Sequence, residues 1–218
     1  MPGTTLVEIE NTHNRGGGIV FPQADVDAIC DVAHAHGVSA FLDGARLWNA
    51  SVASGLPPAA LARPFDVVSV ALSKGLGAPG GSLLAGTKAH MQRAVRARRM
   101  LGGAMRQNGI FSAAGLHALD HHLPLLAADH AHARRLAAVV AACPGVRLDL
   151  ATVQTNIVIF HLEPGAPDAA MVVARARERG VLVIAFGPRT VRAVTHFNVS
   201  AADCEQAAAV LADSLEAA

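Results

Sequence analysis

The chain has 218 residues, of which 52% are hydrophobic, enough to form the core of one large domain or of two small ones. Its 18 Lys and Arg residues almost balance 17 Asp and Glu residues, and the formal net charge of +1 argues against a partner that is nucleic acid or a charged membrane surface. Three cysteines at long spacings, Cys30, Cys143 and Cys204, fit neither a disulfide framework nor a CxxC metal site. Since there is no signal-peptide pattern and no apolar run of membrane-helix length, we predict a soluble, cytoplasmic protein.

The first part of the chain alternates short apolar segments with helical patterns. Strands are predicted at residues 5–10, 38–42, 66–72 and 82–85, and helices at residues 24–36, 87–101 and 110–143. Pro124 interrupts the last of these helices, because a proline inside a helix removes a backbone hydrogen bond. This alternation is typical of an α/β protein with a mainly parallel sheet.

The second part repeats the alternation of strand and helix on a smaller scale. Strands are predicted at residues 146–150, 156–162, 181–185 and 191–195, and helices at residues 168–179 and 201–215. We place a domain boundary near residue 125, so that residues 1–125 form a larger domain and residues 126–218 a small α/β domain.

The motif around Lys74 gives the first indication of chemistry. The run DVVSVALSKGLGAPGGS (66–82) places Lys74 after a predicted buried strand and inside a glycine-rich turn. Glycine lets the backbone adopt unusual angles and approach a ligand closely, and a lysine held in this way can form a Schiff base with a carbonyl compound. A lysine exposed in a surface loop explains this segment alone equally well.

Asp43 follows the preceding strand as Lys74 follows its own. In open α/β sheets ligands bind at the carboxyl ends of the strands, so both residues are expected at one edge. A pyridoxal phosphate enzyme needs a lysine for the cofactor, an acid on its ring nitrogen and cations or donors for the carboxylate and phosphate. Arg46, three residues after Asp43, points to the same side if the turn is helical. Asp43 can instead be a helix N-cap at this junction.

Five runs spread over most of the chain carry a more specific signal. They are ENTHNRGGG (10–18), LDGARLWNA (42–50), SKGLGAPGGS (73–82), LGGAMRQNG (101–109) and VRAVTHFNV (191–199). Together and in this order they resemble the L-threonine aldolase family of pyridoxal phosphate enzymes, which has an aspartate-aminotransferase-like fold. The resemblance implies that residues 1–125 are the remainder of a fold type I, pyridoxal phosphate-binding large domain and that residues 126–218 are its small C-terminal α/β domain.

The resemblance also implies roles for particular residues. Lys74 resembles the lysine that carries the cofactor, Asp43 the acid on the pyridine nitrogen, and Arg46 the arginine beside the cofactor hydroxyl and the substrate. Arg192 resembles the arginine that binds the substrate carboxylate, for which a planar guanidinium is suited. Arg106 resembles a phosphate-contacting arginine donated across a subunit interface, so a homo-oligomer (dimer or tetramer) is expected; a simple helix-end cation is the alternative.

Several other polar residues receive no functional role. Asn14 lies in the glycine-rich loop near the start of the chain, and we interpret it as part of the loop structure. No metal site is predicted, since the adjacent His121 and His122 point in different directions on a helix and His130 is interpreted as structural.

The implied activity is the cleavage of a β-hydroxy amino acid, L-threonine or L-allo-threonine, to glycine and acetaldehyde. The base that accepts the β-hydroxyl proton is not assigned, and a water molecule or a histidine outside this sequence are the alternatives. A pyridoxal phosphate lyase for another β-hydroxy amino acid, or a non-catalytic remnant that acts only as an assembly partner, are the alternative functions.

Threonine aldolases carry a substantial segment before the run that begins here at Glu10, which only nine residues precede. In the family that segment supplies early sheet strands, a glycine-rich turn for the cofactor phosphate and a histidine stacked on the cofactor ring. Without it, a parallel sheet is left with an exposed apolar edge. We therefore expect this chain alone to bind pyridoxal phosphate weakly and to turn over slowly.

Overall fold

The structure is a computed structural model that describes residues 3–216. In that range the chain forms two compact units, the first of residues 3–12 and 20–124 and the second of residues 13–19 and 125–216. The short stretch 13–19 thus belongs with the C-terminal part of the chain, which the sequence analysis did not predict. None of the helices within residues 3–216 has the length and apolar character needed to cross a membrane.

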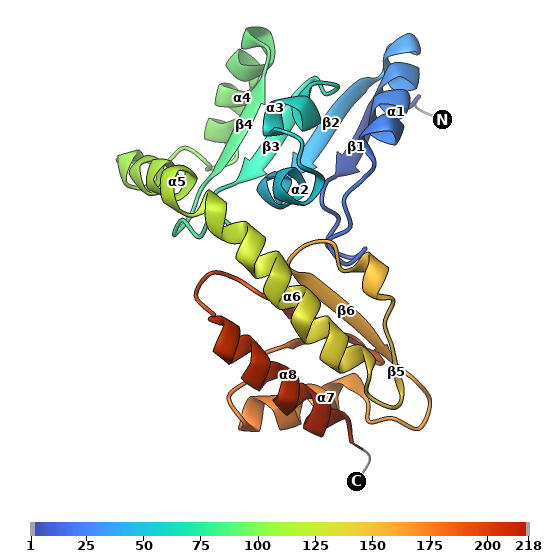
Figure 1. Cartoon of the computed structure of the whole chain (residues 1–218). Helices are drawn as coiled ribbons and strands as arrows, with labels where there is room; N and C mark the ends of the chain where they lie inside the picture. Colours follow the sequence, from blue (N-terminus) through green and yellow to red (C-terminus); the bar gives the residue numbers. More distant parts are fainter. Residues whose placement is uncertain (1–2, 217–218) are drawn as a thin grey trace. The chain divides into compact units, whose positions relative to one another are not determined.

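The first unit is built on a four-stranded sheet (Figure 1). Its elements are, in chain order, β1 (Leu6–Glu10), α1 (Gln23–Ala35), β2 (Ser39–Gly44), α2 (Leu47–Ser54), α3 (Pro58–Ala62), β3 (Val67–Ala71), β4 (Ser82–Gly86), α4 (Lys88–Met100) and α5 (Gly109–His121). The strand order is β1-β2-β3-β4, in which β1, β2 and β3 run parallel and β4 runs antiparallel to β3. The predicted α/β architecture with a mainly parallel sheet is confirmed.

Parallel pairing brings the carboxyl ends of β1, β2 and β3 to one edge of this sheet. The register pairs Glu10, the last residue of β1, with Asp43 of β2. Ala40 and Leu42 of β2 point into the core and are each 1% exposed. Because successive side chains alternate between the two faces of a strand, Asp43 points to the other face, where it is half-buried.

The second unit combines helices with an antiparallel sheet (Figure 1). After a short 3₁₀ turn (Leu123–Leu125), its elements are α6 (Leu126–Ala141), β5 (Val146–Arg147), a 3₁₀ turn (Leu150–Thr152), β6 (Ile157–Leu162), α7 (Ala169–Glu178), β7 (Ile184–Gly187), β8 (Thr190–Val194) and α8 (Ala201–Leu215). The strand order is β5-β6-β8-β7, and every neighbouring pair is antiparallel. The predicted strand–helix–strand pattern is present, but β8 lies between β6 and β7.

One strand of the second unit begins later than the sequence predicts. The run VLVIAF (181–186) is apolar throughout, so hydrophobicity alone does not show where pairing starts. In the structure Leu182 is 79% exposed, and β7 starts at Ile184, where pairing with β8 begins. Tertiary pairing rather than the local pattern therefore sets this boundary.

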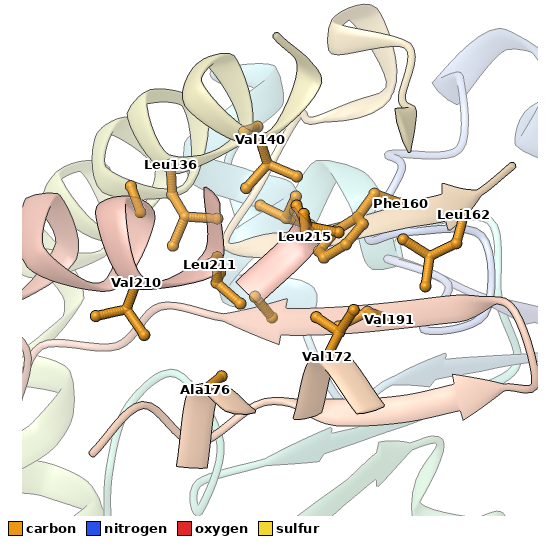
Figure 2. Close-up of a cluster of buried hydrophobic side chains, with 14 of the residues drawn as sticks. Leu136, Val140, Phe160, Leu162, Val172, Ala176, Val191, Val210, Leu211 and Leu215 are labelled. Carbon is orange, nitrogen blue, oxygen red and sulfur yellow. The ribbon is translucent and has the colours of Figure 1, made fainter. Parts of the chain in front are cut away.

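The core of the second unit lies between one face of its sheet and three helices (Figure 2). Val158, Phe160 and Leu162 of β6 and Val191 of β8 belong to this core, each 4% exposed or less. The helices α6, α7 and α8 supply the facing residues, among them Leu136, Val140, Val172, Ala176 and Leu211. Strand alternation therefore points the intervening side chains of β6 and β8 to the face away from the helices.

The loop of residues 13–19 packs on elements of the second unit. The carbonyl of Gly18 accepts a 2.8 Å hydrogen bond from the hydroxyl of Thr155, just before β6, and a single bridge between His13 and Ile19 closes the loop. The loop and β6 together line a cavity of 180 Å³. Residues near the start of the chain thus contribute to the C-terminal unit.

Candidate active site

The turn that carries Lys74 is fixed by buried residues and backbone hydrogen bonds. Leu72 and Leu76, on either side of Lys74, are 5% and 0% exposed. The N–H of Leu72 donates to the carbonyl of Gly81 at 3.0 Å, and the N–H of Gly77 donates to the carbonyl of Lys74 at 2.8 Å. Gly77 and Gly81 have φ of +67° and +104°, which favours glycine at both positions. The backbone of Lys74 is therefore held in place while its side chain is exposed.

Two side chains of the first unit support this turn from outside it. The indole Nε1–H of Trp48, on α2, donates to the carbonyl of Ala71 at 3.1 Å, at the last residue of β3. Nδ1 of His122 lies 2.7 Å from the carbonyl of Leu76. A carbonyl can only accept, so Nδ1 of His122 is the protonated ring nitrogen in this hydrogen bond.

The surroundings of Lys74 lower the pKa of its amine. Partial loss of hydration is the largest cause, and the positive charge of Arg46 is the second. The negative charges of Asp43 and Glu10 act in the opposite direction without cancelling the shift. A lowered pKa increases the uncharged fraction of the amine near neutral pH, and only the uncharged amine is a nucleophile.

Asp43 lies at the carboxyl end of β2 and is held by the turn that follows. Its Oδ1 accepts a 3.0 Å hydrogen bond from the N–H of Ala45, and its carbonyl accepts one of 3.0 Å from the N–H of Asn11. The alternative role as a helix N-cap does not apply, because α2 begins after Arg46 and has no side-chain cap. The Asp43 carboxylate is half-buried.

Arg46 immediately precedes α2 in a turn that is not helical, with φ of −125° and ψ of 29°. The sequence predicted Arg46 and Asp43 on one side only if this turn is helical, and the turn is not helical. Arg46 nevertheless belongs to the same electrostatic group, because its charge acts on Lys74 and its Nη1 lies 3.9 Å from Oε1 of Glu10. Three parallel strands thus bring an amine, two carboxylates and a guanidinium to one edge of the sheet.

The other two predicted arginines lie elsewhere. Arg106 is exposed in the turn between α4 and α5, and no hydrogen bond or ion pair of residues 3–216 joins it to Lys74. Arg192 belongs to β8 of the second unit, where it is half-buried and donates from Nη1 to Oδ1 of Asn14 at 2.8 Å.

Sequence reasoning missed the contributions of Glu10 and Asn14. Glu10 is the last residue of β1 and is paired with Asp43 near the end of β2. Its place at the carboxyl end of a parallel strand is the signal by which the sequence could have identified it as a site residue. For Asn14 no local signal exists, because its partner Arg192 is 178 residues away in the sequence. Within residues 3–216, no three His, Cys, Asp or Glu side chains gather in a group that could hold a metal ion.

Comparison with known proteins places the chain in a family. Residues 1–163 match the Beta-eliminating lyase family. The chain is 38% identical over 203 residues to low-specificity L-threonine aldolase 1 of Arabidopsis thaliana, covering 93% of the chain and 57% of that protein. It is 36% identical to the low specificity L-threonine aldolase of Escherichia coli O157:H7, covering 94% of the chain and 59% of that protein. The chain therefore spans less than two thirds of the length of these curated relatives.

Solved structures show the same fold. A threonine aldolase from Leishmania major superposes with a TM-score of 0.75 at 22% identity, covering 97% of this chain and 61% of that one. A methionine gamma lyase from Micromonospora echinospora superposes with a TM-score of 0.69 at 21% identity, covering 99% of this chain and 64% of that one. The fold is that of the fold type I pyridoxal phosphate enzymes, as predicted.

The chain belongs to the Beta-eliminating lyase family. Within it, the resemblance to threonine aldolases predicted from the five sequence runs is confirmed by the curated relatives.

Enzymes of this family depend on pyridoxal phosphate, and the residues at the sheet edge fit that group chemically. Lys74 offers an amine of lowered pKa for its aldehyde, Asp43 a half-buried carboxylate for its ring nitrogen, and Arg46 a guanidinium for an oxygen substituent.

Proposed function

We propose that this protein uses pyridoxal phosphate to cleave L-threonine or L-allo-threonine to glycine and acetaldehyde. One observation carries the proposal: Lys74, whose pKa is lowered, shares an electrostatic group with Asp43 and Arg46 at the carboxyl ends of neighbouring parallel strands. The relatives described as threonine aldolases support the substrate.

Lys74 is proposed to bind the cofactor covalently through its Nζ. Its lowered pKa supports this role, because the uncharged amine is the form that attacks a carbonyl. When bound, the cofactor accepts the electron pair that is released as the Cα–Cβ bond of the substrate breaks.

Asp43 is proposed to keep a proton on the ring nitrogen of the cofactor. An ionised carboxylate favours the protonated form of a nearby base, and a protonated ring withdraws electrons more strongly. The hydrogen bond from Ala45 to Oδ1 fixes the Asp43 side chain for this purpose. Arg46, oriented by Glu10, is proposed to lie beside the ring hydroxyl.

Arg192 is proposed to bind the substrate carboxylate through its planar guanidinium. In the cleavage itself, the β-hydroxyl loses its proton, the Cα–Cβ bond breaks, Cβ leaves as acetaldehyde, and Cα gains a proton to give glycine. No residue of the described chain is assigned as the base that takes the hydroxyl proton.

The chain offers an internal control for the proposed role of Lys74, because its only lysines are Lys74 and Lys88. The protein is incubated with pyridoxal phosphate, reduced with borohydride and digested, and the modified peptide is identified by mass spectrometry. We expect the adduct on Lys74. We also expect Lys74→Ala to abolish both the adduct and the release of acetaldehyde from threonine, and the exposed Lys88→Ala to preserve both. Modification of Lys88 in place of Lys74 contradicts the proposal.

Product identity separates the alternative functions. Carbon–carbon cleavage of threonine gives glycine and acetaldehyde, whereas loss of the β-hydroxyl gives 2-oxobutyrate and ammonia. A panel of threonine, allo-threonine, serine and a β-phenyl-substituted analogue tests for a lyase of another β-hydroxy amino acid. A non-catalytic remnant releases neither product, and its behaviour does not change in Lys74→Ala.

We also propose a homo-oligomer in which Arg106 serves the neighbouring subunit. Large apolar side chains around Arg106 support an interface there: Met100 is 73% exposed, Leu101 86% and Ile110 69%. If Arg106 acts across the interface, inactive Lys74→Ala and Arg106→Ala chains mixed after unfolding and refolding together regain activity. Mixtures that stay inactive contradict this arrangement.

The three free cysteines support the proposed cytoplasmic location.

A further inference from the structure

Arg192 is held by side chains from two separate parts of the second unit. It lies on β8 between Val191 and Ala193, which belong to the helix-covered core. Strand alternation therefore points Arg192 to the opposite face of the sheet. There its Nη1 donates to Oδ1 of Asn14 at 2.8 Å, and its guanidinium carbon lies 4.9 Å from the centre of the Phe186 ring.

The position of Asn14 is set by the loop of residues 13–19. The N–H of Gly17 donates to the carbonyl of Asn14 at 3.2 Å, and the N–H of Gly18 donates to the carbonyl of His13 at 2.9 Å. The hydroxyl of Thr155 anchors the loop through the carbonyl of Gly18. Asn14 is thus an acceptor held at a fixed place relative to β8, and not a residue of a free loop.

Phe186 contributes a different kind of contact. It lies on β7 at an irregularity in the pairing with β8, between Ala185 and Gly187. Its ring accepts the guanidinium of Arg192 and, at 5.1 Å, that of Arg15. An aromatic face attracts a cation without using any of its N–H donors. The ring can therefore hold the Arg192 guanidinium in place and leave its N–H donors for a ligand.

The guanidinium retains hydrogen-bonding capacity in this arrangement. Arg192 Nε is buried and has no hydrogen-bond partner within residues 3–216, and the described contacts use only one of its five N–H groups. A long arginine side chain loses rotamer freedom when it binds. A side chain that is already held by Asn14 and Phe186 loses less of that freedom on binding a planar anion.

We propose that Asn14 and Phe186 are positioning residues that pre-orient Arg192 to bind the carboxylate of the amino acid substrate. The inference rests on the proposed function for the identity of the ligand, and it deepens that proposal by naming what orients the carboxylate-binding group. Asn14 holds the guanidinium through its Nη1, and Phe186 holds it through the face of its ring.

The test compares glycine with glycinamide, which lacks the carboxylate, by calorimetric titration of the cofactor-loaded protein. Wild-type protein binds glycine more tightly than glycinamide. Asn14→Ala weakens glycine binding about tenfold, as expected for the loss of a hydrogen bond to a charged group, and leaves glycinamide binding unchanged. Phe186→Leu keeps the apolar volume and weakens glycine binding about threefold, whereas Phe186→Tyr restores it. Gln206 is an exposed amide on α8, and Gln206→Ala is the matched control, which changes the binding of neither ligand.

A double substitution shows whether these residues act through Arg192. In an Arg192→Ala background, Asn14→Ala and Phe186→Leu cause no further loss of glycine binding, because the group that they position is gone. Additive losses in that background overturn the inference. So does an equal loss of glycine and glycinamide binding, or a wild-type protein that does not distinguish the two ligands. Circular dichroism shows whether Asn14→Ala folds. If it does not, the positioning role is decided by Phe186→Leu and Phe186→Tyr, because Phe186 lies on β7 and not in the loop of Asn14.

The outcome is separable from that of the proposed reaction. Threonine cleavage is followed in parallel by acetaldehyde release. A protein that prefers glycine in the predicted pattern but does not cleave threonine refutes the proposed reaction and supports the positioning role. A protein that cleaves threonine with the same KM in Asn14→Ala, Phe186→Leu and wild type refutes the positioning role alone.

Discussion

Gly18→Ala is expected to destabilise the second unit by forcing a side chain into filled space. Gly18 has φ of +75°, and an added Cβ lies 2.3 Å from Oγ1 of Thr155 and 3.2 Å from Cβ of Ile157. Thr155 and Ile157 are both 0% exposed. The hydroxyl of Thr155 also donates to the carbonyl of Gly18 itself, so it cannot move aside without losing that hydrogen bond.

The neighbouring glycine separates the two contributions to this cost. Gly17 has φ of +84° and nothing within 4 Å of an added Cβ, so Gly17→Ala introduces only the backbone strain of a positive φ, about 1–2 kcal/mol. Gly18→Ala introduces similar strain and also the overpacking of a buried site, which costs a further ~1–3 kcal/mol. The difference between the two variants therefore measures the contact of the loop with Thr155 and Ile157.

Urea unfolding followed by far-ultraviolet circular dichroism measures the effect. With a denaturant slope of about 1–3 kcal/mol per molar urea, Gly18→Ala is expected to unfold at a urea concentration about 1 M below that of Gly17→Ala. The chain has one tryptophan, Trp48 in the first unit, so its fluorescence gives the unfolding of that unit as an internal reference. Equal unfolding midpoints for the two alanine variants refute the packing of the 13–19 loop on the second unit.

Two further predictions concern the second unit. Asp129 is 1% exposed, and burial raises the pKa of its carboxyl to about 6, although the charges of His196 and His132 act in the opposite direction. The folded protein therefore holds this proton more tightly than the unfolded chain, in which the pKa is 3.8. The resulting stabilisation is fully present below pH 3.8 and is lost as the pH rises through 6. An amide at this position carries no such proton to lose, so the free energy of unfolding of Asp129→Asn should gain up to about 3 kcal/mol relative to wild type as the pH rises between these values. Burial lowers the pKa of His130 to about 4, but both proteins contain this residue and the comparison is unaffected. Parallel pH profiles of the unfolding midpoint contradict this prediction. Ser200→Ala removes a capping box at the start of α8, in which Oγ of Ser200 accepts from the N–H of Asp203 at 3.2 Å and Oδ2 of Asp203 accepts from the N–H of Ser200 at 2.8 Å. The expected loss is about 1 kcal/mol, and an unchanged midpoint in urea excludes a stabilising role for the cap.

The first unit follows closely from its sequence because its signals are local. An apolar run ending in SKGLG predicts a buried strand and a glycine turn, and β3 and the turn after it are found where the run places them. The same is true of Asp43 at the end of β2. The general rule that parallel strands end at one edge then brings Asp43 and Lys74 together, without any need to know the details of packing.

The second unit is less predictable because its arrangement depends on distant partners. The apolar run 181–186 contains no mark of where β7 begins, and pairing with β8 decides it. Hydrophobic periodicity also does not predict that β8 lies between β6 and β7, because it indicates which face of a strand is buried and not which strands are paired. Backbone conformation in the turn before α2 likewise depends on its surroundings, and Arg46 is not in the helical turn that its spacing from Asp43 suggested.

The amino-acid sequence by itself therefore determined the fold class, the order of strands and helices along the chain, the family resemblance and the lysine at the end of β3. Only the tertiary structure decided that residues 13–19 belong with the second unit and that Asn14 meets Arg192. The physical reason is the range of the interactions. Hydrophobic periodicity, glycine turns and proline breaks act between residues that are close in the chain, whereas the hydrogen bond between Asn14 and Arg192 joins residues 178 positions apart and exists only once both have been placed by the packing of β6, β7 and β8.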